Sequence, residues 1–243
     1  GEDYSTLSLV VYDLDGAEEV ALALDVPPSG QHTASLSTAT VRGVESSFDW
    51  SADGSGIYLV QQKDTPEGDR FRDLFFWDLN AKKPRRLTSG IRVGHVRSHP
   101  TEASLTISRS VDSQPSIWQV DYSGENLHKL FDLDPFQTVR DVEWSLNGDT
   151  LFVLAGPDSP ELISWSDGSL TTTEKPGWTS FAVHPQNHAL IAASTLSGIS
   201  NLVQDDAWLT DVNFGAFDPH IAPDGSIVAS VFGEDGFTIK HYQ

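Results

Sequence analysis

The sequence contains no cysteine and no methionine. Without cysteine, the chain can form no disulfide framework and offers no thiolate as a metal ligand or nucleophile. Without methionine, no initiator residue is present, so we expect the chain, which opens Gly-Glu-Asp-Tyr, to be a trimmed piece of a longer protein.

Basic residues are also scarce. Lys and Arg number 15 against 35 Asp and Glu, which gives a formal net charge of −20. Such a charge repels nucleic-acid phosphates and anionic lipid surfaces, so we expect neither as a direct partner. No run approaches the ~20 apolar residues of a membrane-spanning helix, and no charged-then-apolar leader opens the chain. We therefore expect no direct membrane insertion, and a monomer in isolation. One basic cluster, Lys82–Arg86, is interpreted as a solvated hairpin.

Helical periodicity is missing as well. No window of about 12 residues carries apolar residues at i, i+3, i+4 and i+7. Instead, Thr, Val, Ile and aromatic residues stand in short alternating runs between clusters of Gly, Pro, Asp and Asn, which is typical of strands and turns. A chain of 243 residues can bury ~70–75% of its unfolded surface in one body. The sequence therefore predicts a single all-β domain over residues 1–243.

A degenerate motif recurs five times: an apolar strand, then Ser or Pro, then a turn and a second apolar strand. Its anchors are Ser51, Pro100, Ser145, Pro185 and Pro223, spaced 49, 45, 40 and 38 residues apart. Recurrence near 40 residues is typical of a four-stranded propeller blade. A second motif, an apolar strand running into an Asp-rich turn, occurs at Asp13, Asp78, Asp121, Ser166 and Asp205, with a truncated sixth copy at the C-terminus.

Five first motifs and six second motifs favour a six-bladed β-propeller of four-stranded antiparallel blades, with a five-bladed ring as the alternative. We expect the first and last blades to be incomplete, because the last lacks an outer strand and the first lacks inner ones. The predicted ranges are a partial blade over 1–30 and blades over about 44–90, 91–133, 138–175, 178–213 and 214–243. Large rings are expected to fill the wedges between blades at Trp50, Trp77, Trp118, Trp144 and Trp165.

Several segments resemble the TolB-type propeller repeat. They are residues 73–88 (DLFFWDLNAKKPRRLT), the Trp-Ser-x-x-Gly turns at Trp50 and Trp144, residues 197–202 (SGISNL) and residues 215–225 (GAFDPHIAPDG). The form they resemble occurs in large bacterial cell-envelope proteins, where a peptidase-like zinc domain and sometimes an outer-membrane barrel flank the propeller. The resemblance implies a non-catalytic interaction module of the periplasm or cell envelope, with any peptidase chemistry outside these residues.

The sequence departs from this pattern at two His-Pro pairs, which begin at His99 and His184, and at Ser166. Both histidines align with the Trp of the Trp-Ser turns, so we interpret them as half-buried structural residues that hydrogen-bond to a neighbour.

Signatures of catalysis and metal binding are scarce. The two-histidine helix motif of zinc peptidases, the Gly-x-Ser-x-Gly nucleophile turn and Gly-rich phosphate loops are all missing. His95 and His99 are four residues apart, but on a predicted strand that spacing is ~13 Å, too long to share one metal. We predict no catalytic residue, no metal site and no cofactor in this chain.

Propeller geometry provides the one candidate binding site. The first strand of each blade lines the central channel, so residues five positions before each anchor are expected to form a ring. These residues are Ser46, His95, Arg140, Ser180 and Asp218. A polar ring with one His, one Arg and one Asp is a candidate docking point for a peptide end or a small anionic ligand.

Three functions stay open from the sequence. The leading hypothesis is a binding module that recruits another envelope protein or a peptide segment. The first alternative is a hydrolase-type propeller, a lactonase or glycan-cleaving enzyme, with its site at the channel mouth. The second is an extracytoplasmic ligand-sensing domain of a membrane regulator.

Overall fold

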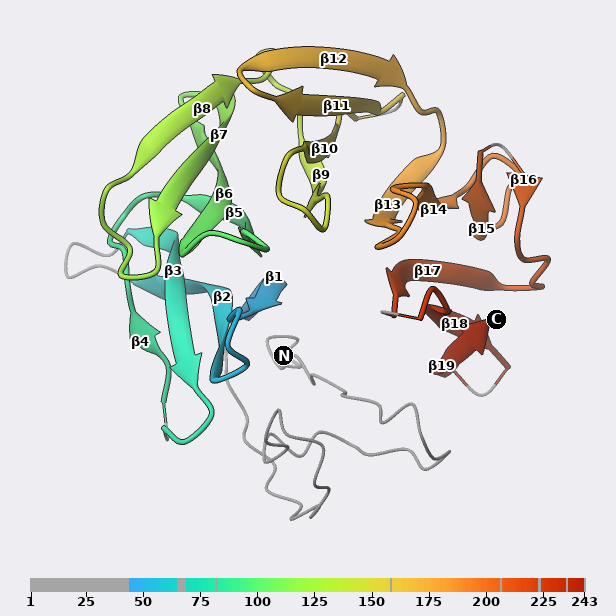
Figure 1. The fold of residues 1–243 in the computed structure, drawn as a ribbon, viewed down its shortest axis with the longest axis horizontal. Helices are drawn as coiled ribbons and strands as arrows, with labels where there is room; N and C mark the ends of the chain where they lie inside the picture. Colours follow the sequence, from blue (N-terminus) through green and yellow to red (C-terminus); the bar gives the residue numbers. More distant parts are fainter. Residues whose placement is uncertain are drawn as a thin grey trace. The chain divides into compact units, whose positions relative to one another are not determined.

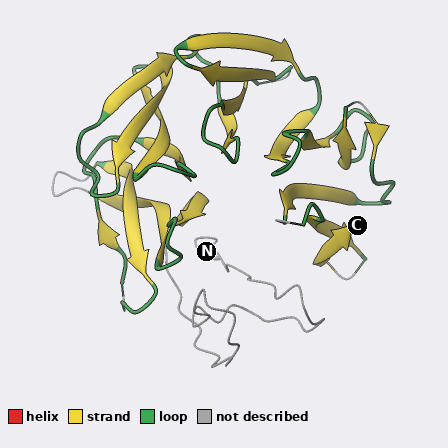
Figure 2. Ribbon diagram, viewed as in Figure 1, coloured by secondary structure: helices red, strands yellow, loops and turns green. Residues whose placement is uncertain are grey.

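The computed structural model describes residues 44–64, 69–81, 83–157, 159–205, 207–222, 224–234 and 236–242. Throughout these ranges the regular structure is β-strand, and the nineteen strands form five sheets (Figures 1 and 2). The described residues include no helix with the length and apolar character needed to cross a membrane.

Each sheet is assembled in chain order. The first contains β1 (Val44–Trp50), β2 (Gly56–Asp64), β3 (Arg70–Asp78) and β4 (Arg85–Arg86). The second contains β5 (Val93–Ser98), β6 (Ser104–Val111), β7 (Gln114–Asp121) and β8 (His128–Asp132). The third contains β9 (Val139–Trp144), β10 (Leu151–Ala155), β11 (Glu161–Ser166) and β12 (Ser169–Glu174). The fourth contains β13 (Trp178–Val183), β14 (Leu190–Ser194), β15 (Asn201–Gln204) and β16 (Ala207–Trp208). Of the described strands, the fifth contains three: β17 (Gly215–Ile221), β18 (Ile227–Gly233) and β19 (Gly236–Tyr242).

The chain divides into two compact units. Of the described residues, the first comprises those of 44–98, Ala103–Asp112 and Ser116–Asp132, and the second comprises His99–Glu102, Ser113–Pro115 and those of 133–242. Within the first unit, β1 packs beside β5; within the second, β13 packs between β9 and β17 (Figure 1). Four-stranded sheets that follow one another in the chain and pack first strand beside first strand are the blades of a β-propeller.

The described residues form five blades, so the six-bladed count is wrong for them and the five-bladed alternative is confirmed. The sixth blade was inferred from a copy of the second motif near Asp13 that had no first-strand motif beside it. The predicted partial blade over 1–30 lies outside the described residues, as does residue 13. Among the described residues the last blade has three strands and ends at β19, in agreement with the expected lack of an outer strand.

The core of each unit lies between neighbouring sheets. In the first unit, Val60 of β2 and Leu105 of β6 are fully buried in one cluster. In the second unit, Leu154 of β10 and Phe181 of β13 share another. In the second unit, four of the five residues of β14 are buried, because its sheet packs against the third sheet on one face and the fifth on the other.

The tryptophans fit this core unequally. Trp77 is only 7% exposed, and Trp118, Trp144 and Trp165 are half-buried. Trp50, however, is 38% exposed, so its expected role between blades is wrong. It is the last residue of β1, where the strand runs out into the turn.

A buried carboxylate fastens the end of the first sheet. Asp73 of β3 is fully buried and accepts hydrogen bonds from Gly90 N (3.1 Å), Ile91 N (3.1 Å) and the Thr88 hydroxyl (3.3 Å). The Arg86 guanidinium also donates to it in an ion pair. Because every partner follows β4 or belongs to it, the Asp73 side chain fixes the course of the chain from β4 toward β5.

The fourth sheet repeats this network with a neutral side chain. The amide oxygen of Asn201 accepts from the Thr210 hydroxyl (2.9 Å) and from Val212 N (3.0 Å). The same hydroxyl accepts from Leu202 N, as the Thr88 hydroxyl accepts from the backbone N–H after Asp73. Both blades thus place a buried oxygen acceptor, charged or neutral, at this position.

The turn after each first strand is closed by one recurring backbone hydrogen bond. The residue that follows the strand donates its N–H across the turn, at 2.8 to 2.9 Å, in Ser51, Ser145, His184 and Ala222. His184 therefore occupies the Ser position, and the alignment of the His-Pro pairs with Trp-Ser is wrong by one residue. The physical reason is that an imidazole nitrogen, like a serine oxygen, can accept a hydrogen bond from a backbone N–H of the turn, although from a different residue.

The side chains at this position accept different N–H groups of the turn. Ser51 Oγ accepts from Gly56 N (3.0 Å), whereas His184 Nδ1 accepts from Gln186 N (3.2 Å). His99 Nδ1 accepts from Glu102 N (3.0 Å), and its ring lies 4.3 Å from that of Trp144 between centroids. Both histidines are structural residues hydrogen-bonded to a neighbour; His184 is half-buried as expected, whereas His99 is buried.

Replacing Asp73 with Ala is expected to lower the free energy of unfolding by about 3–5 kcal/mol, because Arg86 and two backbone N–H groups lose their acceptor. Denaturant unfolding followed by tryptophan fluorescence would measure this loss. Asp64→Ala removes the same charge from an exposed ion pair with Arg70 and is the matched control, with an expected change below about 1 kcal/mol. Equal effects of the two substitutions would contradict the role given to Asp73.

A pH-dependent contribution is expected from the first turn. Hydrogen bonds from Ser55 N (3.0 Å) and from the Ser51 and Ser55 hydroxyls lower the pKa of Asp53 from 3.8 to about 2. Because the folded pKa is depressed, the stabilisation is complete above about pH 4 and is lost as the pH falls through 2. The difference in unfolding free energy between wild type and Asp53→Asn should therefore shrink from pH 5 to pH 2. Glu174→Gln, an exposed charge removal on β12, is the control; a difference that does not vary with pH would refute the assignment.

Candidate binding sites

The five residues predicted to ring a channel all lie on first strands. Ser46 is on β1 and His95 on β5 in the first unit; the second unit holds the other three, Arg140 on β9, Ser180 on β13 and Asp218 on β17. Each is described within its own unit, and the ring as a whole stays a prediction. Among the described residues, no group of three or more His, Asp or Glu side chains lies together as metal ligands would.

Strand register changes which residues are equivalent. Equivalent residues lie three positions before the last paired residue of each first strand. They are Ser47, His95, Asp141, Ser180 and Asp218. Ser46 and Arg140 are therefore one position away from the set they were predicted to join. The error has the same origin as the turn alignment, because the anchors in the two His-Pro turns stand one residue later than the serines.

Two members of the corrected set join neighbouring blades. Ser47 Oγ accepts a hydrogen bond from Val96 N (2.9 Å) within the first unit. Asp141 Oδ2 accepts from Phe181 N (3.0 Å) within the second. Both side chains are buried. Each thus ties the first strand of one blade to the first strand of the next.

The same position in the fourth blade lacks this bond. Ser180 would face the backbone nitrogen of Pro219, which carries no hydrogen. The Ser180 hydroxyl oxygen is buried and has no hydrogen-bond partner among the described residues. Asp218 is exposed and has a positive φ of 47°, so it belongs to an irregular stretch at the β17–β18 register shift.

Arg140 and His95 are engaged in the scaffold. Arg140 donates from Nε to Gly156 O (2.7 Å), from a terminal nitrogen to Pro157 O, and from Nη1 to Trp178 O (3.5 Å). It therefore fastens the start of β9 to the end of β10 and to β13. His95 donates its N–H to Ser108 Oγ (2.8 Å), and its Nδ1 lies 3.1 Å from the same oxygen.

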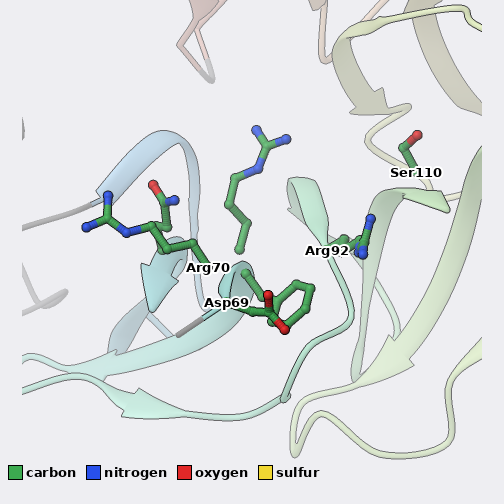
Figure 3. Close-up of a pocket in the computed structure, with 7 residues that line it drawn as sticks. Asp69, Arg70, Arg92 and Ser110 are labelled. Carbon is green, nitrogen blue, oxygen red and sulfur yellow. The ribbon is translucent and has the colours of Figure 1, made fainter. Parts of the chain in front are cut away.

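An open hollow with a volume of about 690 Å³ lies in the first unit (Figure 3). We call it the arginine hollow, and it is lined by Gln62, Asp69, Arg70, Phe71, Arg72, Arg92 and Ser110. These residues stand where β2 and β6 end and where β3 and β5 begin. Three arginines against one aspartate make it locally basic in a chain of net charge −20.

The three arginines of the hollow are held differently. Arg70 Nε pairs with Asp64 Oδ1 at 2.8 Å, and both side chains are largely exposed. The Arg92 guanidinium lies 5.2 Å from the centre of the Phe71 ring, in cation–π distance. Arg72 is exposed on β3, and within the described part of the chain it makes no ion pair. In the view of Figure 3, Asp69 lies between Arg70 and Arg92, with Ser110 on the Arg92 side.

A second surface lies on the fifth sheet. Four rings contact one another in sequence: the centroid distances are 6.3 Å from Phe214 to Phe232, 4.9 Å from Phe232 to Phe237, and 6.1 Å from Phe237 to Phe217. Phe214, Phe232 and Phe237 are 50%, 40% and 68% exposed. We call this group of four the phenylalanine surface. Phe217 is the less exposed member, and its ring lies over Gly215, where a Cβ would approach it to 2.4 Å.

Sequence reasoning missed both surfaces. The hollow collects side chains from two blades, and nothing in the repeat pattern singles out Arg70, Arg72 or Arg92. The phenylalanine surface left one signal, since Phe217 belongs to the GAFDP segment that carries part of the TolB-type resemblance.

These blades define a β-propeller, and both candidate surfaces lie where its strands begin or end. No protein-family model matches the chain, and no curated protein matches its sequence. Solved structures do match. The structure of a putative TolB from Agrobacterium tumefaciens is 17% identical with a TM-score of 0.62, over 80% of this chain and 79% of that one. TolB from Acinetobacter baumannii is 16% identical with a TM-score of 0.59, over 80% of this chain and 50% of that one.

An enzyme shares the fold as well. An oligogalacturonate lyase solved in complex with manganese is 12% identical with a TM-score of 0.61, over 82% of this chain and 65% of that one. The chain thus spans half of the Acinetobacter TolB chain and less than two thirds of the lyase chain. At these identities the likeness shows the fold alone: a β-propeller, which both TolB structures and the lyase share.

The corrected set of equivalent residues generates a paired stability test. Asp141→Ala is expected to lower the free energy of unfolding by about 1–3 kcal/mol, because the buried Phe181 N–H loses its acceptor. Ser180→Ala removes an oxygen that has no partner among the described residues, so stability should stay the same or rise. Thermal and denaturant unfolding of the two variants would measure this contrast. A loss at Ser180 equal to that at Asp141 would contradict it.

Proposed function

We propose that this chain is a non-catalytic binding propeller that docks onto a protein or peptide partner through the phenylalanine surface. The observation that carries the proposal is the row of four contacting rings, three of which are 40–68% exposed. Monomeric soluble proteins rarely expose contiguous apolar patches, and aromatic side chains are enriched at the centres of protein interfaces. A partner that covers these rings would remove them from water.

The surroundings of the rings indicate the partner's character. Asp218 follows Phe217 directly and is exposed, and exposed Glu234 stands in the turn between Phe232 and Phe237. An apolar centre with an acidic border is complementary to a partner that presents apolar side chains flanked by Lys or Arg. The net charge of −20 would speed encounter with such a partner.

The proposal places the propeller in the periplasm or cell envelope of a bacterium, as part of a larger protein. It is supported by the TolB-type sequence resemblance together with the shared fold of the two bacterial TolB structures. In that setting the propeller would present a partner or substrate to domains outside this chain.

A second candidate is a propeller enzyme that cleaves glycans or lactones. The fold likeness to an oligogalacturonate lyase favours it. A screen of the full-length protein with oligogalacturonates and lactones, with and without added divalent metal, separates the two candidates. Turnover above that of a heat-denatured sample would favour the enzyme.

Phe237→Ser is expected to weaken binding of the partner at least 10-fold, since truncating an aromatic residue at the centre of an interface typically costs 2 kcal/mol or more. The partner is first identified by crosslinking the intact parent protein in an envelope fraction, and then measured in purified form. Phe136→Ser is the matched control, because Phe136 is 79% exposed and lies outside the phenylalanine surface. No reproducible crosslinked partner, or equal weakening by both substitutions, would contradict the proposal.

A further inference from the structure

We propose that the arginine hollow of the first unit is a binding site for a carboxylate, supplied by a peptide's C-terminus or by its acidic side chains. This inference concerns a different surface from the phenylalanine surface and does not depend on it. Its first support is the distribution of charge: with only 15 basic residues in 243, three arginines line one open hollow, and they outnumber its Asp69 even though Arg70 is paired with Asp64. Scattered solvation of an acidic chain does not need such a concentration of positive charge.

The second support is that the position of Arg92 is fixed before any ligand binds. Its guanidinium lies over the Phe71 ring, 5.2 Å from the centroid, so a cation–π contact holds the group beside the hollow. The backbone of Arg92 has a positive φ of 60°, a conformation that is unfavourable for a residue other than glycine. Such strain persists only where the surroundings impose it.

The surroundings impose it through the buried Asp73. Its carboxylate holds Gly90 N and Ile91 N, the two residues directly before Arg92. On the other side of the loop, Arg109 Nε donates to Ile91 O at 2.7 Å. The loop that aims Arg92 at the hollow is therefore fixed before any ligand arrives, which lowers the entropic cost of binding.

The third support is the set of donors that complete the hollow. Arg72 and Gln62 are cross-strand partners in the β2–β3 register, so their guanidinium and amide come from adjacent strands. The Ser110 hydroxyl lines the β6 side. A guanidinium matches a carboxylate with two parallel hydrogen bonds, and the amide and hydroxyl can donate to the remaining lone pairs.

Ligand charge favours carboxylate over phosphate. The field of a chain with net charge −20 opposes every anion in proportion to its charge, so a monovalent carboxylate loses less than a dianionic phosphate. The Phe71 ring adds an apolar face beside the donors, which suits the carbon skeleton of a peptide.

The test uses the full chain labelled with ¹⁵N and follows the arginine Nε–H signals by NMR. Three probes are titrated: a tetrapeptide with a free C-terminus and no acidic side chain, a C-terminally amidated tetrapeptide with two glutamates, and inorganic phosphate. We expect saturable shifts of the Arg72 and Arg92 signals with one or both peptides. The first peptide reports recognition of a C-terminus, and the second reports recognition of acidic side chains.

Variants make the result specific. Arg72→Gln and Arg92→Gln are each expected to weaken peptide binding at least 10-fold. Arg72→Lys is expected to bind better than Arg72→Gln but less well than the wild type, because an ammonium group cannot make the two parallel hydrogen bonds of a guanidinium. Arg85→Gln, an exposed arginine of β4 outside the hollow, is the matched control and should leave binding unchanged. Because Arg92 has a constrained backbone, thermal unfolding checks its variant, and Arg72→Gln decides alone if that variant is unfolded.

The proposal is overturned if neither peptide shifts these signals, if only phosphate does, or if Arg85→Gln weakens binding as much as Arg72→Gln. Phe237→Ser should bind the peptides as well as the wild type does. Failure here would therefore leave the proposed docking through the phenylalanine surface intact, and the reverse also holds.

Discussion

A sheet of three or four short strands has two faces, and this chain has no other secondary structure in its described residues with which to cover them. Within each unit a neighbouring sheet covers such a face, and three apolar clusters lie between neighbouring sheets for that reason. The same constraint explains the buried polar residues of the first strands. Where Ser47 or Asp141 accepts the N–H of the next blade, the contact between sheets gains a fixed register in addition to apolar burial.

Buried oxygen acceptors also fix the loops that follow the strands. Asp73 and Asn201 occupy matching positions in their blades, yet one carries a charge and the other does not. What the position requires is an acceptor for a threonine hydroxyl and for the backbone N–H groups that follow it. The charged version also pairs with Arg86 and holds the segment that ends in Arg92. In this blade the interaction that stabilises the fold also positions Arg92, a candidate ligand-binding residue.

The repeat spacing was enough to predict a propeller, because about 40 residues per unit with alternating apolar runs leaves few other architectures. The register within the repeat was not predictable, since His184 makes the backbone hydrogen bond that a serine makes in other blades, and the proline after it was aligned with that serine instead. That one-residue error displaced Ser46 and Arg140 from the predicted ring. The two surfaces were hidden for another reason: Arg72 and Arg92 come from different sheets, and Phe214 and Phe237 come from distant parts of one blade. Such neighbours follow from tertiary packing and not from any local pattern.

The two surfaces share a place in the architecture of the blade. Arg92, Ser110 and Arg72 stand where a first strand begins, a second strand ends and a third begins. Phe214, Phe232 and Phe237 occupy the same three places in the fifth blade. At the opposite end, the turn after the first strand is fixed by one recurring backbone hydrogen bond, which a side-chain acceptor joins in some blades. Loops freed from that requirement can carry guanidinium groups in one blade and aromatic rings in another, because the strands beneath them are held in either case.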